Sequence, residues 1–170
     1  MNTRIARTLA FAALAAASSA YAGDLSPKDT QFVTKAAVAG LSEVEQSKLA
    51  LERSANPKIK SYADKMVTDH GGANRKLEKL AQENGWMLPS APDADAKAKI
   101  DALAQTQGDA FDRQYALNMK ADHDAAVALF RDAAKNADAS ALRGFATDTL
   151  PTLEQHRKES GELPPAARRN

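Results

Sequence analysis

Two short segments of the sequence carry the same spacing of chemically active side chains. Met66 to His70 reads Met-Val-Thr-Asp-His, and Met119 to His123 reads Met-Lys-Ala-Asp-His. The chain has three histidines, and the third is His156. Imidazole nitrogens and carboxylate oxygens are ligands for iron, zinc, copper, nickel and manganese. Two of three histidines in one repeated context therefore suggest a metal site.

Each of four expected helices places one ionisable residue on its apolar stripe. Hydrophobic residues that recur every three or four positions define that stripe, which faces the core. The four inward residues are Glu43, His70, His123 and His156. A buried charge without a partner is costly. Four groups that share a cation avoid this cost, so we expect these residues to be the metal ligands.

Several roles are open for the aspartates and the methionines of the repeated segments. Asp69 and Asp122 lie about 100° around the helix from the histidine that follows, so they are outer ligands, hydrogen-bond partners of the ligands, members of a salt bridge between helices, or solvated acids. Met66 and Met119 lie one turn before the histidines on the same face. They are core residues, or thioether ligands that would favour Cu(I).

The rest of the chain predicts an all-α fold that positions these residues. The expected long helices span residues 27–55, 58–83, 109–135 and 139–160, and a shorter helical segment spans 93–106. Ser26-Pro27 begins the first helix, and Asn84-Gly85 ends the second. The long connection between helices two and three predicts a ferritin-like antiparallel four-helix bundle.

The positions of the inward residues along their helices test whether they can meet. Glu43 lies about 12 residues before the end of the first helix, and His70 about 12 after the start of the second, so both reach the same height. His123 and His156 match less well, at about 12 and about 18 residues from their connection. A kink at Pro151 is expected to absorb part of that difference.

The first 22 residues have the features of a cleaved signal peptide. A basic start with Arg4 and Arg7 precedes an apolar run, and Ala20-Tyr21-Ala22 matches a cleavage site. The expected organisation is a signal peptide over 1–22, the bundle over 23–163 and a flexible tail over 164–170. The apolar run is too short to span a membrane. We expect a periplasmic protein, with outer-membrane association as the alternative.

The composition narrows the classes of partner and reaction. The chain has 23 basic and 22 acidic side chains and no cysteine, so neither a nucleic-acid partner nor a disulfide framework is expected. A protein partner or a homo-oligomer stays open, although no feature of the sequence indicates one. No nucleophile triad, phosphate loop or dinucleotide motif is present. An oxidoreductase activity remains open, although no substrate is indicated.

Several segments of the sequence together resemble those of a known family. They are Glu43-Val44-Glu45, Met66 to His70, Phe111-Asp112-Arg113-Gln114-Tyr115, Met119 to His123, and Leu150-Pro151-Thr152-Leu153 with His156. Over about residues 25–160 the chain resembles the bacterial exported proteins called domain of unknown function 4142. The resemblance implies a ferritin-like four-helix fold and implies no activity. The chain lacks the two Glu-x-x-His motifs of di-iron ferritins, which argues against iron storage.

Two functional hypotheses follow from the sequence. The first is a periplasmic bundle that binds one transition metal, with Fe, Zn, Cu or Mn as the candidates, for metal handling or for protection against redox stress in the envelope. The second is a metal-free envelope stress or interaction protein, in which the same polar residues form a buried hydrogen-bond network.

Overall fold

A computed structural model describes residues 24–163 of the chain. Within this range the protein is all-helical, with five helices and no strand. The helices are α1 (Pro27–Arg53), α2 (Pro57–Asn84), α3 (Ala94–Ala104), α4 (Gly108–Asn136) and α5 (Ser140–Gly161). The expected signal peptide, residues 1–22, and the expected tail, residues 164–170, lie outside the described residues.

The helix ends follow the local sequence signals. Ser26 caps α1 by accepting a hydrogen bond from the backbone of Asp29 at 3.4 Å, and Pro27 occupies the first turn. Asn56 caps α2 in the same way, 2.9 Å from the backbone nitrogen of Lys58. Gly85 ends α2 in the left-handed conformation, with a φ of 71°, which a glycine adopts without strain. The predicted boundaries are thereby confirmed to within about two residues.

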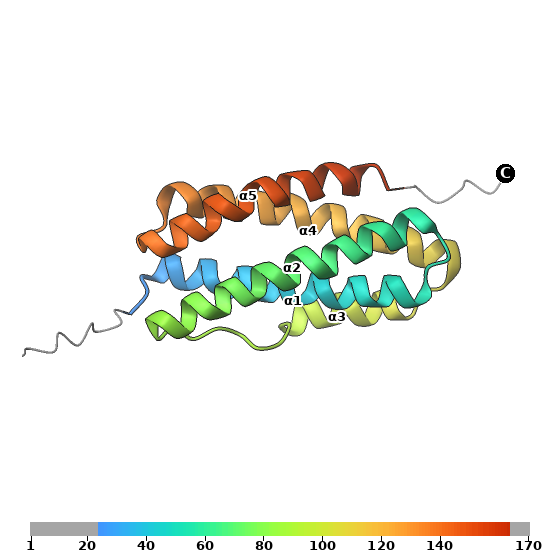
Figure 1. Cartoon of the computed structure of the whole chain (residues 1–170). Coiled ribbons are helices and arrows are strands. Elements are labelled where there is room, and N and C mark those ends of the chain that lie inside the picture. The colour runs from blue at the N-terminus through green and yellow to red at the C-terminus, as the bar shows by residue number, and fades with distance from the viewer. Residues whose placement is uncertain (1–23, 164–170) are drawn as a thin grey trace, which may run out of the picture.

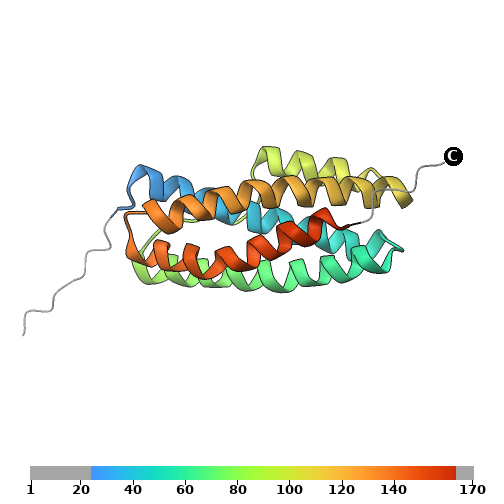
Figure 2. The ribbon, with the colours of Figure 1, turned by 90° about the horizontal axis from the view of Figure 1, so that it is seen from above.

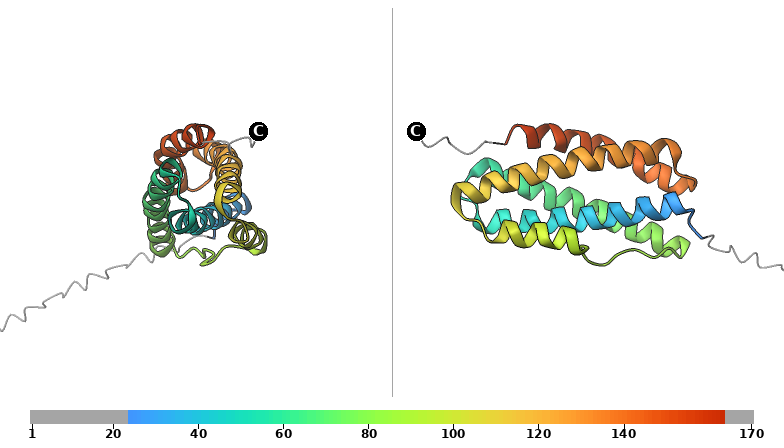
Figure 3. Two further views of the ribbon diagram at one scale, coloured as in Figure 1. Left: turned by 90° about the vertical axis from the view of Figure 1, so that its right-hand side faces the viewer. Right: turned by 180° about the vertical axis from the view of Figure 1, so that it is seen from behind.

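The four long helices pack around a common interior (Figure 1). α1 pairs with α2 and α4 pairs with α5, while α1 also contacts α4 and α2 contacts α5. Neighbouring long helices run in opposite directions, because the connection from α2 to α4 returns along the length of the bundle (Figure 1). The view along the bundle shows α3 outside the ring of four, against α1 and α4 (Figure 3).

The interior is divided along its length into two apolar clusters. One holds the Phe32, Phe130 and Phe145 rings near the α4–α5 turn, and the other holds Tyr62, Tyr115 and their neighbours near the α1–α2 turn. α3 covers only the half of the bundle that contains the second cluster (Figure 2). The polar residues considered next lie between the two clusters.

None of the described helices combines the length and the apolar character that a membrane crossing requires.

Candidate metal centre

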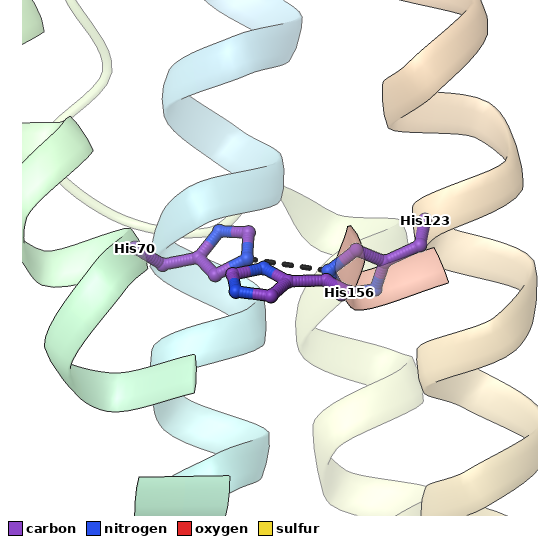
Figure 4. A group of neighbouring side chains, drawn as sticks. All are labelled: His70, His123 and His156. Carbon is purple, nitrogen blue, oxygen red and sulfur yellow. Dashed lines mark hydrogen bonds between the residues drawn. The ribbon is translucent and has the colours of Figure 1, made fainter. Parts of the chain in front are cut away.

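The four inward residues expected from the sequence meet at mid-length of the bundle. Each comes from a different long helix: Glu43 from α1, His70 from α2, His123 from α4 and His156 from α5. All four are buried, with exposed fractions between 0 and 5%. The centroids of the three imidazole rings lie 5.3–5.4 Å apart, and the rings converge from three directions (Figure 4). α5 runs without interruption through Pro151, and His156 reaches the level of His123.

Glu43 forms a buried pair with His70. The Nδ1 of His70 lies 2.8 Å from the Oε2 of Glu43, with both side chains almost completely enclosed. A carboxylate accepts hydrogen bonds, so this contact places a proton on Nδ1 and leaves Nε2 of the ring facing the interior. The carboxylate therefore orients the histidine and fixes the nitrogen that is free to bind an ion.

His123 is oriented by its own helix. Its Nδ1 donates to the backbone carbonyl of Met119 at 2.8 Å, one turn earlier in α4. The Nε2 of His123 then lies 3.3 Å from the Nε2 of His70. Because both Nδ1 atoms are engaged with acceptors, both Nε2 atoms present lone pairs to each other. Two lone pairs at this separation repel unless a proton or a cation lies between them.

His156 completes the group from α5. Its Nε2 lies 2.9 Å from the Oδ2 of Asp69, the aspartate of the first repeated segment. Its Nδ1 is buried and has no hydrogen-bond partner among the described residues. One ligand nitrogen from each of the three histidines can be chosen so that all lie within 4.8 Å of one another. The buried histidine triad is therefore able to hold a metal ion.

The charges of the centre are strongly coupled. Burial alone would raise the pKa of Glu43, but the neighbouring His70 and His123 outweigh it and lower the pKa to about 2. Burial opposes a charge on His70 as well, yet the Glu43 carboxylate raises its pKa above the ordinary value. Burial and the charge of His70 lower the pKa of His156 to about 4. The Glu43 carboxylate thus favours a proton on His70, whereas burial disfavours a proton on His156.

The two aspartates of the repeated segments take different positions. Asp69 is partly exposed and contacts His156 directly. Asp122 contacts no histidine and instead pairs with Lys99 of α3 and accepts a hydrogen bond from Gln46 of α1 at 3.2 Å. Asp69 thus has the position of a hydrogen-bond partner of a ligand, whereas Asp122 joins three helices.

Met66 and Met119 both lie in the buried apolar cluster beside the histidines, with exposed fractions of 0%. This placement agrees with their interpretation as core residues. Thioether ligation and direct ligation by Glu43 stay predictions.

Sequence reasoning missed a second polar group next to the centre. Gln46 donates to Ser42 at 3.2 Å and accepts from Asn118 at 2.7 Å, and all three side chains are buried. Gln46 follows Glu43 by three residues, which places it one turn further along the inward face of α1. This three-residue spacing from Glu43 is the sequence feature from which the buried position of Gln46 could have been predicted. The group is internally hydrogen-bonded, so it stabilises the α1–α4 contact beside the centre.

Comparisons with known proteins are consistent with this architecture. The sequence model of the family described as "Domain of unknown function (DUF4142)" matches residues 14–163. No curated protein matches the sequence of this chain.

Solved structures show a similar fold. The chain superposes on a DUF305 fragment from Deinococcus radiodurans with a TM-score of 0.72, at 17% identity, over 83% of this chain and 97% of that one. It also superposes on CopM in its Ag-bound form, with a TM-score of 0.64 at 20% identity, and in its Cu(II)-bound form, with a TM-score of 0.66 at 18% identity. Each CopM match covers 79% of this chain and 93% of CopM. At these identities the likeness concerns the fold alone.

Proposed function

We propose that this chain, which belongs to the DUF4142 family, binds one transition-metal ion at the centre of its helical bundle. The ligands are the Nε2 atoms of His70 and His123 and the Nδ1 of His156. The observation that carries the proposal is the arrangement of these nitrogens, since the other nitrogen of each ring already contacts Glu43, the Met119 carbonyl or Asp69. Such hydrogen bonds to the far nitrogen are typical of metal-binding histidines.

Copper is the ion that we favour. Imidazole ligands suit copper, zinc, iron and nickel, so the histidines alone do not choose among them. Two further observations support copper: the similarly folded CopM has been crystallised with Ag and with Cu(II), and two methionines lie one turn before histidines of the centre. Softer thioether sulfur would suit Cu(I) if either side chain turned towards the ion.

The proposed role is metal handling or redox protection in the periplasm. The ferritin-like architecture is part of this proposal, and it is supported by four long helices with a crossover between the second and the third. Three histidine ligands leave a fourth position of a tetrahedral ion open to another ligand. An ion held in this way can be transferred or can change its oxidation state.

Metal analysis of the purified protein tests the proposal. The protein is produced without a histidine tag, freed of metal and titrated separately with Cu²⁺, Cu⁺ under reducing conditions, Zn²⁺, Fe²⁺ and Mn²⁺. We expect one equivalent of copper per chain, lost in His123→Ala and in His156→Ala. Asp122→Asn is the matched control, because Asp122 lies next to a histidine in sequence but contacts none. If the wild-type protein takes up none of these ions, the metal hypothesis is wrong and the polar group is a structural network.

A further inference from the structure

A small cavity lies beside the proposed ligands, in the interior between the four long helices. Its volume is about 20 Å³, which is sufficient for one water molecule or a small ion. Its lining includes Glu43 and His70 of the centre and Gly40, Ala73 and Asn74 at the seam between α1 and α2, and side chains of α4 and α5 complete it. Ala73 and Asn74 are partly exposed, so this part of the lining reaches the protein surface. The cavity thus borders both the seam between α1 and α2 and the histidine centre.

Glu43 presents an unpaired oxygen in this region. Its Oε2 contacts His70, but its Oε1 is buried and has no hydrogen-bond partner among the described residues, with the Nδ1 of His123 3.6 Å away. A buried carboxylate oxygen without a partner is costly, and a cation or its bound water would satisfy it. One residue of the cavity lining therefore carries an oxygen suited to hold a cation before it reaches the histidines.

Asn74 occupies the seam because residue 40 is a glycine. A Cβ atom at Gly40 would lie 2.1 Å from the Oδ1 of Asn74, far inside contact distance. The absence of a side chain at this position lets the Asn74 amide lie directly against the α1 backbone. Gly72, on the same helix as Asn74, has open space where its Cβ would be. The close approach at Gly40 is thus specific to the Asn74 side chain.

We propose that metal ions reach the centre through this seam, with Asn74 as the residue that closes it. This inference rests on the proposed metal-binding function. An incoming ion displaces the Asn74 side chain, is held by the Oε1 of Glu43, and passes to the Nε2 of His70. Asn74 therefore controls the rates of loading and release, while the histidines determine the equilibrium affinity.

Kinetics of Cu²⁺ loading separate these two roles. Metal-free protein is mixed with Cu²⁺ in a stopped-flow absorbance experiment, and the affinity is measured separately by competition with a chelator. We expect Asn74→Ala to load on the order of tenfold faster, which corresponds to a barrier lower by about 1.4 kcal/mol. Asn74→Leu, which fills the seam with an apolar side chain, should load more slowly. Release rates change by the same factor, so the affinities of both variants stay at the wild-type value.

Gly72→Ala is the control, since it changes the same helix without touching the seam. Wild-type loading rates in both Asn74 variants, with copper still bound at equilibrium, would overturn the entry route and leave the metal site intact. Slower loading in Asp69→Asn together with unchanged Asn74 variants would place entry on the His156 side, which also overturns it. Absence of equilibrium binding in the wild type would overturn both the route and the proposed function.

Discussion

The two Met-x-x-Asp-His segments share a pattern and differ in what surrounds them. In both, the methionine and the histidine lie on the buried face of their helix, one turn apart. The first histidine, His70, is held by a carboxylate from another helix, and the second, His123, by the carbonyl of Met119 in its own helix. The first aspartate contacts the centre, whereas the second contacts α3. The repeated pattern therefore places each histidine on the buried face of its helix, while the hydrogen-bond partner of each Nδ1 differs with the surroundings.

The largest expected effect separates the two histidines in the metal-free protein. His70→Ala leaves the buried Glu43 carboxylate without its partner, so we expect a loss of about 3–5 kcal/mol in the free energy of unfolding. His123→Ala removes a ring that is held by its own helix and leaves the Glu43–His70 contact in place, so its loss should be smaller. Urea denaturation of both variants measures the difference. If His70→Ala cost no more than His123→Ala, Glu43 would not depend on His70 for its charge.

A second substitution checks the cause of that loss. Glu43→Gln removes the charge, so it should recover part of the stability that His70→Ala loses when the two changes are combined. A double variant less stable than His70→Ala would show that the ion pair is not the source of the effect.

The aspartates provide the next comparison, with the same chemical change made in both segments. Asp69→Asn weakens the acceptor that orients His156, and we expect a 10- to 100-fold loss in copper affinity, as is usual for such partners. Asp122→Asn should leave the affinity unchanged, because Asp122 pairs with Lys99 and Gln46 instead. Competition with a chelator measures both. Equal losses in the two variants would contradict the assignment of different roles.

The pH dependence of stability reports on the same coupled groups. The pKa of His156 is lowered to about 4 in the folded protein from its ordinary value of 6.5. Between pH 6.5 and pH 4 the unfolded chain therefore binds more protons than the folded protein. Stability of the metal-free protein should therefore decrease from pH 6.5 to 4. It should decrease further towards pH 2, because the pKa of Glu43 is lowered from 4.5 to about 2.

His70 contributes with the opposite sign. Its pKa is raised in the folded protein, so its contribution is complete below 6.5 and is lost as the pH rises through the folded value. The free energy of unfolding, measured from unfolding curves at each pH, should thus fall as the pH decreases below 6.5 and also as the pH rises through the folded pKa of His70, with a maximum between these two ranges. His156→Gln should flatten the acid side, and an unchanged slope in that variant would contradict the assignment to His156.

Much of this comparison was visible in the sequence. The apolar stripes predicted the four long helices and the inward direction of Glu43, His70, His123 and His156, because burial follows the helical period. The heights along the first helix pair were also predictable, since residue counts convert directly into length. The family resemblance is confirmed by the match over residues 14–163.

The rest depends on contacts between helices that no local pattern encodes. The partner of Asp122 is Lys99, on a short helix that packs outside the bundle, and its position follows from the path of the crossover. The approach of Asn74 to Gly40 likewise depends on how closely α1 and α2 pack. The glycine pair directly after His70 makes no such approach, since no backbone of another helix lies within 4 Å of the Cβ position of Gly71 or Gly72.

The smallest expected effect concerns that glycine pair. Gly72 lies two residues after His70, and the corresponding residue of the second segment, Ala125, is an alanine. A Cβ at Gly72 meets nothing within 4 Å, so Gly72→Ala should raise the free energy of unfolding by roughly 0.5–1 kcal/mol through helix propensity. Gly40→Ala should lower it, because its Cβ displaces Asn74. Thermal denaturation of both measures the signs. A destabilising Gly72→Ala would mean that the first segment needs local freedom next to His70 that the second does not.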